Sequence, residues 1–430
     1  MKLRSQMQLA GLFISLLATI SPALASTWTL DKVVSLTRHG VRPQTNTEKL
    51  DKATQLEWPK FDVADGNLTG HGYAGMMQQG AYLFAQWQQQ GLNIQSQCPK
   101  QEQFFLWTSP SPRIKATGKA MADGMFPGCG VAPLSVNAKY GPLFELYHLH
   151  ESHPDQAIMK QQIMARIGTP EQAAERYKAS TELLRKTVCA QDKPSCEFLD
   201  KPWGVKFKDT GKPKLKGPGE LGATIGETIR LQYSDNMPIS DVAFGHGVDA
   251  KAVKALMAMH AAQYDLALDT PEFASHAGSL LMRQMLSAIT SGTELSKQWP
   301  GDKRLERPLV MLFGHDTNIA EIQTMLGMKW ELPNYPANDI PPGATLSFAR
   351  FHKAGSDQEF VRVRFEARTL DQWRSLSPLN NQQPLPHQDL NVAGCEATDV
   401  GVLCPLDTVV KRASHLLVND GLQLALFQTK

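Results

Sequence analysis

The segment Arg38-His39-Gly40-Val41-Arg42 places one imidazole between two guanidinium groups. Guanidinium groups bind phosphate oxygens through paired hydrogen bonds and keep their charge at any biological pH. The neighbouring cations disfavour the protonated form of His39, so its ring can stay a neutral nucleophile under acidic conditions. The segment therefore indicates a nucleophilic imidazole in an anion-binding loop. The alternative interpretation is a surface loop that happens to be basic.

Three apolar segments of the chain each end in a cluster of polar residues. We predict that these segments are strands and that they position the loop and two further polar clusters. The segments are residues 32–37, 104–108 and 308–313. The clusters are Arg38 to Arg42, Arg113, and His315-Asp316. Short apolar runs are typical of buried strands, and open α/β sheets bind ligands beyond the carboxyl ends of their strands. We therefore expect one site at which the three clusters meet.

Helical patterns surround these strands. Residues 317–322 begin with polar residues and continue with a helical period. Residues 171–186 and 220–233 are also predicted helices, while strand signals fade between about residues 136 and 274. The expected division is a mostly helical insertion domain at residues 136–274 and an α/β core at residues 26–135 and 275–430.

The first 25 residues have the pattern of a secretory signal peptide. Lys2 and Arg4 precede an apolar run over residues 9–20, and Ala23-Leu24-Ala25 offers a cleavage site after Ala25. A membrane anchor, the alternative, needs about 18 continuous apolar residues, and polar residues interrupt this run. We therefore expect a secreted, periplasmic protein that has no membrane segment after cleavage.

The formal charge of +2 corresponds to Lys2 and Arg4, so the roughly 405 residues after the signal peptide are electrically balanced. Their number fits one large domain with an insertion, or two domains. Any preference for anions must come from local groups. The charge balance also argues against nucleic-acid binding.

Six cysteines follow the signal peptide, and disulfides are the usual state of an even number of cysteines in an exported chain. Six cysteines allow 15 connectivities. Their grouping along the chain favours three local pairs. The chain has no CxxC motif, so a metal cluster is disfavoured. The favoured pairs are Cys98–Cys129, Cys189–Cys196 and Cys395–Cys404.

Residues 38–45 resemble the RHGxRxPT signature of histidine acid phosphatases, and Gly314-His315-Asp316-Thr317 resembles their second, HD motif. Further similar landmarks are residues 68–72, 126–129, 340–343, 394–395 and 404–405. Together these motifs cover most of the chain after the signal peptide. Within the family, the resemblance is to the branch of bacterial periplasmic phytases and glucose-1-phosphatases.

The resemblance implies an α/β fold with a phosphoglycerate-mutase-like core, that is, a mixed, mostly parallel sheet flanked by helices. It also implies that His39 is transiently phosphorylated and that Asp316 protonates the leaving alcohol. No cofactor or metal is implied, because cationic side chains stabilise the phosphoryl group. The groups implied to hold the phosphoryl oxygens are Arg38, Arg42, Arg113 and His315.

Two positions depart from the family pattern. Relatives often show Arg-x-Arg where this chain has Arg113-Ile114-Lys115, and a lysine lacks the planar fork of a guanidinium. Asn46 stands where some phytases have a lysine that contacts substrate, while the HDT form of the HD motif favours a phytase over a glucose-1-phosphatase. Candidate substrate contacts are Thr45, Thr317, Glu227 and Lys251.

Two other segments have open interpretations. His148, His150 and His153 could bind a metal if the first two share one face of a strand, but ordinary polar residues are the favoured interpretation. The basic run 201–216 is either a solvated hairpin or part of a pocket for a highly anionic substrate.

We therefore expect a monomeric, secreted acid phosphomonoesterase that removes phosphate stepwise from inositol hexakisphosphate (phytate). A glucose-1-phosphatase or broad-specificity acid phosphatase is the main alternative. A phosphoryl-transferring mutase and a non-catalytic phosphate-binding protein are more remote. The expected partner is a small phosphorylated molecule, phytate or a sugar phosphate.

Overall fold

The computed structural model describes residues 27–94 and 97–429. The predicted signal peptide, residues 1–25, lies outside the described residues. Within the described part of the chain, no helix is both long enough and apolar enough to cross a membrane.

A central sheet has the strand order β10-β11-β8-β7-β1-β6-β2-β3, and β9 pairs with β8. All three strands predicted from the sequence are confirmed as β1, β2 and β6, and β6 lies between the other two. The bounds are β1 Trp28–Arg38, β2 Phe104–Thr108, β3 Leu134–Ser135, β6 Leu309–Gly314, β7 Thr345–Lys353, β8 Glu359–Glu366, β9 His387–Asp389, β10 Glu396–Thr398 and β11 Gly401–Pro405.

The sheet is mixed, as expected, but its parallel pairing is confined to β1, β6, β2 and β3. The strands from β7 onward pair in the antiparallel sense with their neighbours, and β7 also lies antiparallel to β1. This follows from the connections, because β7 and β8 are joined by a short turn and parallel neighbours need a long crossover.

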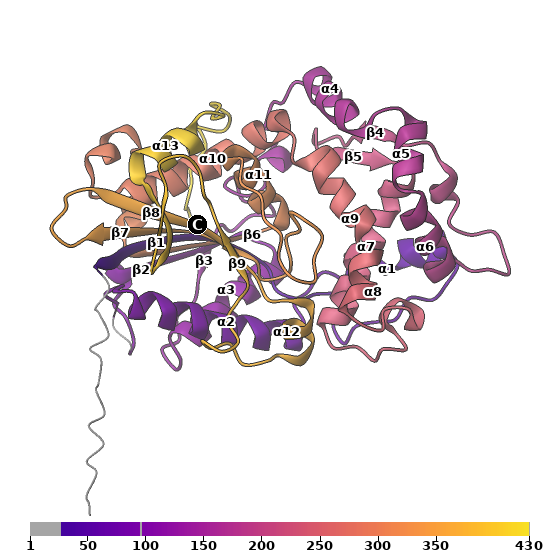
Figure 1. Cartoon of the computed structure of the whole chain (residues 1–430), viewed down its shortest axis with the longest axis horizontal. Coiled ribbons are helices and arrows are strands. Elements are labelled where there is room, and N and C mark those ends of the chain that lie inside the picture. Colours follow the sequence, from indigo (N-terminus) through magenta and orange to yellow (C-terminus); the bar gives the residue numbers. More distant parts are fainter. Residues whose placement is uncertain (1–26, 95–96, 430) are drawn as a thin grey trace, which may run out of the picture.

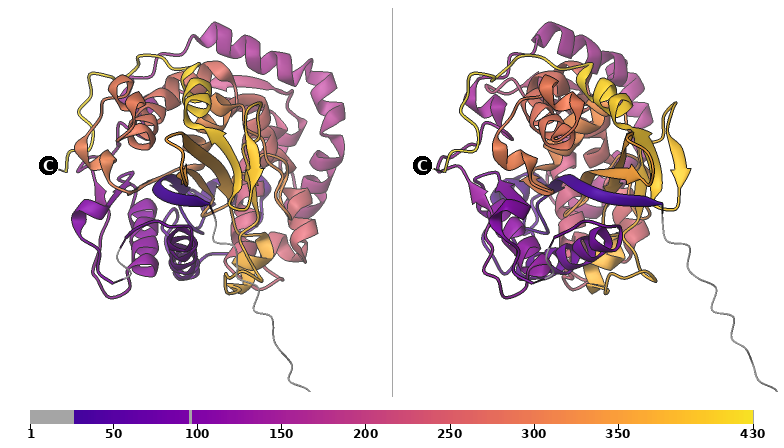
Figure 2. Two further views of the ribbon diagram at one scale, coloured as in Figure 1. Left: turned by 60° about the vertical axis from the view of Figure 1, so that its left-hand side comes forward. Right: turned by 90° about the vertical axis from the view of Figure 1, so that its left-hand side faces the viewer.

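Helices cover both faces of the sheet (Figures 1 and 2). One layer consists of α2 (Gly70–Gln89) and α3 (Pro112–Met125), and the other consists of α10 (Pro271–Thr290), α11 (Asp316–Leu326) and α13 (Leu406–Ser414). Strand β6 is apolar throughout because both of its faces are buried. Met311 packs in the cluster beside α2 and α3, whereas Val310 and Leu312 pack in the cluster beside α10 and α11.

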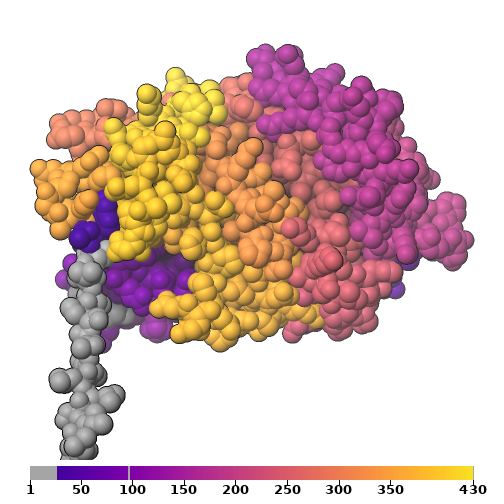
Figure 3. All heavy atoms as spheres, in the orientation of Figure 1, coloured from indigo at the N-terminus to yellow at the C-terminus, as the bar shows by residue number. Residues whose placement is uncertain are grey.

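Residues 136–274 contain mostly helices and one hairpin, which form one side of the molecule (Figure 3). The predicted helix at 171–186 is two helices that meet at Tyr177, and the predicted helix at 220–233 lies within α7. The exact domain boundaries stay a prediction. The bounds are α4 Gln156–Ile167, α5 Pro170–Arg176, α6 Lys178–Val188, β4 Gly204–Phe207, β5 Pro213–Lys216, α7 Pro218–Ser234, α8 Ala250–Leu256 and α9 Ala258–Gln263.

Two short helices complete the description, α1 (Thr47–Thr54) and α12 (Leu370–Ser375). Although α1 follows β1 in sequence, it joins the helical side of the molecule (Figure 1). Its last residues accept backbone hydrogen bonds from Ala190 and Cys196, at 3.0 and 2.7 Å. Helix α1 therefore packs against the predicted insertion domain.

The three predicted disulfides, Cys98–Cys129, Cys189–Cys196 and Cys395–Cys404, are confirmed. The second of them closes the loop that donates backbone hydrogen bonds to α1. The third joins the residue before β10 to a residue of β11 across the open end of this antiparallel pair, beside the Glu396–Leu403 pair.

Candidate active site

The three predicted polar clusters meet at one edge of the sheet, as expected. Because β1, β6 and β2 are parallel and in register, their carboxyl ends coincide, with Arg38 beside Gly314 and Thr108 beside Phe313. Helices α3 and α11 begin directly beyond β2 and β6, so their amino termini also lie at this edge. Helix amino termini favour anions, which adds to the attraction from the side chains.

A close approach between α2 and the loop after β1 fixes the position of His39. The backbone N–H of Thr69 donates to the carbonyl of Val41 at 3.1 Å, and Thr69 caps α2. A Cβ atom on Gly72 would lie 2.4 Å from the same carbonyl, so only glycine allows this contact. The resemblance landmark at residues 68–72 thus has a packing role beneath the loop.

His39 is buried, and its hydrogen bonds identify which ring nitrogen carries the lone pair. Nδ1 lies 2.9 Å from the carbonyl oxygen of Gly40, which can only accept, so Nδ1 carries the proton. Nε2 then holds the lone pair and accepts from Nε of Arg42 at 3.3 Å. Burial, followed by Arg42 and Arg38, holds the pKa of His39 well below its usual value. The ring is therefore a neutral imidazole with Nε2 directed at the cationic cluster.

Arg38, Arg42 and Arg113 surround this nitrogen. Burial lowers the pKa of Arg42 to about 10 and also lowers that of Arg113. Burial also lowers the pKa of Arg38, but the nearby carboxylates of Glu227 and Asp316 outweigh this effect and raise the pKa above its usual value. All three guanidiniums stay charged at acidic and neutral pH, and a buried cluster of like charges favours an anion between them.

His315 caps the start of α11 and is oriented by groups that the sequence did not reveal. Its Nε2 lies 3.2 Å from Oε1 of Glu145 and 3.3 Å from Oγ of Ser109, while Nδ1 lies 3.5 Å from a terminal nitrogen of Arg113. Burial lowers the pKa of His315, although Glu145 opposes this. Glu145 comes from a segment with no recognisable motif, so only the folded chain places it here.

Asp316 is the first residue of α11 and faces the arginines. Its Oδ2 lies 3.0 Å from Arg38, and its Oδ1 accepts from the N–H of Thr317 at 2.8 Å. Burial raises the pKa of Asp316, but Arg38 outweighs this and holds the pKa well below its usual range. Asp316 is therefore a carboxylate in this structure.

A buried network behind Arg38 connects the site to α7. Glu227 lies 2.5 Å from Arg38 and also pairs with Arg230, which lies 2.5 Å from Asp339. Although burial raises the pKa of Glu227, Arg230 and Arg38 hold it well below its usual value. Glu227, predicted as a substrate contact, is thus a carboxylate that already pairs with guanidiniums and would repel phosphate. Its helical spacing from Arg230 is the one sequence signal for this network.

A pocket of about 260 Å³ opens beside the arginines, and most of the predicted contacts line it. Arg42, Thr45, Thr317 and Asp316 are among its lining residues. Lys251 is not among them and lies exposed on α8, so its role as a substrate contact stays a prediction. Lys115 is also exposed and outside the pocket lining, so it does not replace an arginine there.

The histidine-rich segment does not have the geometry that a metal site would need. Residues 146–149 form a 3₁₀ helix instead of a strand, and the ring of His148 stacks on Tyr140 with centroids 4.4 Å apart. This geometry supports the interpretation of His148 as an ordinary polar residue.

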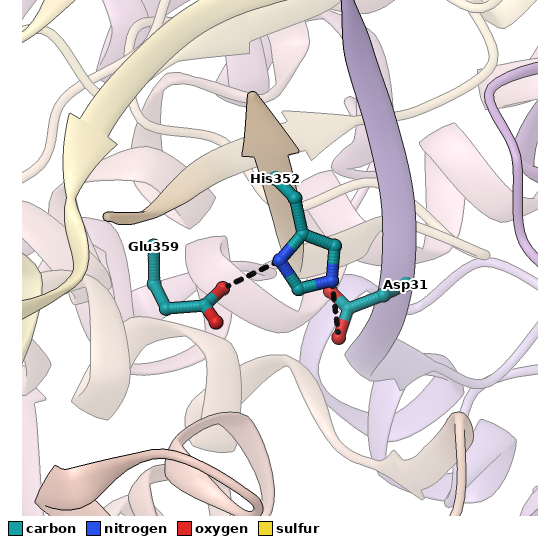
Figure 4. A group of neighbouring side chains, drawn as sticks. All are labelled: Asp31, His352 and Glu359. Atoms are coloured by element: carbon teal, nitrogen blue, oxygen red, sulfur yellow. Dashed lines mark ion pairs between the residues drawn. The ribbon is translucent and has the colours of Figure 1, made fainter. Parts of the chain in front are cut away.

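A different cluster, Asp31, His352 and Glu359, brings three potential metal ligands together at the far end of β1 (Figure 4). His352 lies 3.3 Å from Asp31 and 3.2 Å from Glu359. However, Arg350 lies 2.5 Å from Asp31 and 3.6 Å from Glu359. Since this guanidinium already balances the carboxylates and would repel a divalent cation, we assign no metal to the cluster.

The fold and the site together define a histidine phosphatase. The chain matches the family model of the histidine phosphatase superfamily (branch 2) over residues 29–366 and belongs to that family. The predicted resemblance and the fold class are thereby confirmed.

Its relatives include both classes of enzyme expected from the sequence. The chain is 28% identical to the phytase AppA of Escherichia coli over 92% of this chain and 94% of the relative. It is 25% identical to the glucose-1-phosphatase of Salmonella typhimurium over 88% and 90% of the two chains.

Solved structures of bacterial phytases are also similar to this chain. The phytase of Klebsiella sp ASR1 is 34% identical with a TM-score of 0.85, over 93% of this chain and 97% of that chain. The Hafnia alvei phytase in complex with myo-inositol hexakis sulphate is 30% identical with a TM-score of 0.81, over 93% and 98%.

Proposed function

We propose that this protein is an acid phosphomonoesterase that forms a phosphohistidine at Nε2 of His39, and that phytate is its main substrate. The observation that carries the proposal is the neutral His39 ring, whose unprotonated nitrogen points into a cluster of three guanidiniums. A nucleophile that is unprotonated at acidic pH and surrounded by fixed cations suits attack on a phosphate ester.

In the first step, Nε2 of His39 attacks phosphorus, a P–N bond forms, and the P–O bond to the leaving alcohol breaks. Arg38, Arg42 and Arg113 bind the phosphoryl oxygens. His315 can donate a further hydrogen bond from Nδ1 once it is protonated, because its Nε2 faces the carboxylate of Glu145. Asp316 gives its proton to the leaving oxygen, because an alkoxide is a poor leaving group.

In the second step, water attacks the phosphohistidine while Asp316, now a carboxylate, accepts a proton from it. The P–N bond breaks, inorganic phosphate leaves, and Nε2 of His39 regains its lone pair. The same residue therefore acts first as an acid and then as a base.

Asp316 must gain a proton before the first step, although the unliganded site keeps it ionised. Bound phosphate engages the guanidinium of Arg38 and brings negative charge close to the Asp316 carboxylate. Both effects raise the pKa of Asp316, so substrate and proton enter the site together. This coupling predicts activity in acidic solution.

Support for phytate comes from the relatives and from the pocket. The phytases above cover nearly the whole chain, and the cations beside the arginines suit a substrate with many phosphate groups. A glucose-1-phosphatase is the second candidate, because the chain is also similar to that enzyme over most of its length. On the basis of the sequence pattern we also propose export and cleavage after Ala25. We propose a monomeric state as well.

Rapid mixing with a chromogenic phosphomonoester tests the mechanism. A burst of alcohol followed by steady release of phosphate is expected, with a base-stable phosphoenzyme in quenched samples. His39→Ala should abolish the burst and lower kcat by at least about 10⁴-fold, as expected for loss of a nucleophile. Near-normal turnover by this variant would refute the mechanism, and absence of any alcohol release by the wild type would favour a non-catalytic phosphate-binding protein.

A substrate panel tests the specificity. We expect kcat/KM to be higher for phytate than for glucose 1-phosphate or an aryl phosphate on the same sample. A preference for glucose 1-phosphate would favour the second candidate instead.

A further inference from the structure

Strand β8 places charged side chains on a face of the sheet that a helix covers. Its apolar residues pack in the cluster beside α10 and α11 and are Val361, Val363 and Phe365. Because side chains alternate along a strand, the charged residues between them face the other side, where α2 lies (Figure 1). These residues are Arg362, Arg364 and Glu366. Arg362 and Glu366 are only 3% and 6% exposed, and a buried charge destabilises the fold unless it has a partner.

Both arginines have partners within the protein. Arg364 donates from Nε and Nη2 to the carboxylate of Asp389 in β9, at 2.6 and 2.9 Å. Arg362 donates from Nη1 to the carbonyl of Val400 and from Nη2 to Oε1 of Gln90, the latter at 3.0 Å. Each guanidinium is therefore already held by acceptors of this chain.

The carboxyl of Glu366 has no such partner. Among residues 27–94 and 97–429, no hydrogen bond or ion pair to its side chain is present. Burial raises the pKa of Glu366, against the attraction of Arg364 and Arg362. Buried polar groups are normally hydrogen-bonded, and an unmade hydrogen bond is costly. This carboxyl therefore calls for a hydrogen-bonding partner from outside the chain.

His387 supplies a second free group beside it, because it lies directly opposite Glu366 in the β8–β9 pair. Its Nδ1 lies 3.3 Å from the carbonyl oxygen of Leu385, which can only accept, so Nδ1 carries the proton and Nε2 holds a lone pair. Burial, followed by Arg364, lowers the pKa of His387 and favours the neutral ring. The pair thus offers a carboxyl and an imidazole nitrogen to the same ligand.

Both groups line a cavity of about 340 Å³ between α2, β8 and the segment before β9, which we call the α2–β8 cavity. It has no lining residue in common with the pocket beside Arg42 and Asp316. Its volume is at the lower end of the range of about 300–1,000 Å³ that is typical of small-molecule sites. The further polar lining residues are Tyr82 and Gln86 of α2, Gln90 at the end of that helix, and Asn381.

The charges around the cavity favour a neutral ligand. The guanidiniums of Arg362 and Arg364 are matched by the carboxyls of Asp389 and Glu366, so the local field favours neither a phosphate nor a metal ion. A hydroxyl group can both donate and accept, and it therefore pairs with Glu366 whether or not that carboxyl is protonated. Neighbouring hydroxyls of one ligand can donate to the carboxyl of Glu366 and to Nε2 of His387.

We propose that the α2–β8 cavity is a second small-molecule site, which binds a neutral sugar or cyclic polyol through hydroxyl groups that pair with Glu366 and His387. A hydrogen bond of 3.1 Å from Gln86 to Asn381 ties α2 to the segment before β9, and both residues line the cavity. The inference does not depend on the proposed phosphatase chemistry, because none of the residues assigned to the phosphoryl group lines this cavity.

Binding of glucose and of myo-inositol to the full protein tests the site. Ligand-detected NMR titration at neutral pH gives the dissociation constant, with myo-inositol hexakis sulphate present to occupy the pocket beside Arg42. Ligands of about 12 non-hydrogen atoms reach dissociation constants on the order of 1 mM, which we expect for at least one of the two probes. Glu366→Gln should weaken this binding at least about tenfold, because it removes hydrogen bonds to a charged acceptor.

Glu396→Gln is the matched control, because it replaces an exposed glutamate of β10 outside the cavity and should bind the probes like the wild type. Asn381→Trp keeps the test decisive if Glu366→Gln fails to fold. Asn381 is exposed, so an indole at this position adds bulk to the cavity lining without disturbing a buried residue. This variant should prevent binding of the probes and leave turnover of an aryl phosphate at the wild-type value.

Three results would overturn the site: no binding of either probe to the wild type, equal affinities of Glu366→Gln and Glu396→Gln, or unchanged binding by Asn381→Trp. Inorganic phosphate is the last probe. If phosphate displaced the bound sugar or polyol, the cavity would be an anion site and the proposed ligand class would be wrong.

Discussion

Replacement of Asp316 by Asn tests directly whether this carboxyl donates the proton to the leaving alcohol. The amide keeps the size of the side chain, and its oxygen can still accept from the N–H of Thr317. Arg38 loses one carboxylate but retains Glu227 at 2.5 Å, so the buried guanidinium is not left without a partner. We therefore expect Asp316→Asn to fold and to bind phosphate esters.

The magnitude follows from what the amide cannot do, which is to donate a proton to the leaving oxygen. General acid catalysis contributes about 10²- to 10⁴-fold. Phosphoenzyme formation from phytate, whose leaving group is an alkoxide, should slow by about 10³-fold. With 4-nitrophenyl phosphate the leaving phenolate is stable without a proton, and the loss should be less than about tenfold.

The assay is rapid-quench measurement of the first turnover, since Asp316 also acts in the later hydrolysis and steady-state rates mix the two steps. Glu321→Gln is the matched control, because it replaces another buried carboxyl of α11, whose Oε2 accepts from Asn318 at 3.2 Å. Its effect should not depend on the leaving group. Equal losses for both substrates in Asp316→Asn would remove Asp316 from the role of acid.

Two further predictions concern stability. Glu227→Gln should lower the free energy of unfolding by about 3–5 kcal/mol at pH 7, because it leaves buried guanidiniums without their partner. Because the pKa of Glu227 is lowered by folding, its contribution to the free energy of unfolding is complete above the unfolded-state pKa and is lost as the pH falls through the folded-state pKa. In denaturant titrations the difference between the variant and the wild type should therefore shrink below about pH 4. A difference that stays constant with pH would contradict the pairing. Removal of the Cys98–Cys129 disulfide, which spans 31 residues, should cost about 4 kcal/mol, whereas removal of Cys189–Cys196, which spans 7, should cost about 2 kcal/mol; the reverse order would show that strain or contacts dominate over loop entropy.

The sequence predicted the parts of this site that depend on short segments. The strands before Arg38 and His315 are apolar because both of their faces are buried, so their ends could be located from composition alone. The position of Arg113 could be predicted for the same reason, since it follows the third strand. Local spacing likewise predicted the disulfides.

The groups that orient these residues could not be predicted, because they come from distant segments without a pattern. Glu145 reaches His315 from a loop, and Asp339 reaches Arg230 from the segment before β7. The exposed position of Lys251 could not be predicted for the same reason. Its place in the sequence is close to residues that line the pocket, but the orientation of α8 leaves it exposed.

The central position of β6 has a consequence for the order of folding. β1 and β2 are separated by β6, which lies more than two hundred residues later in the chain, so neither can complete its pairing until residue 314 has been synthesised. Contacts between such distant segments form slowly, because closing the intervening loop costs entropy before any contact stabilises it. His39 and Asp316 therefore come together only after the long segment between them has folded, and we expect activity to appear late during refolding.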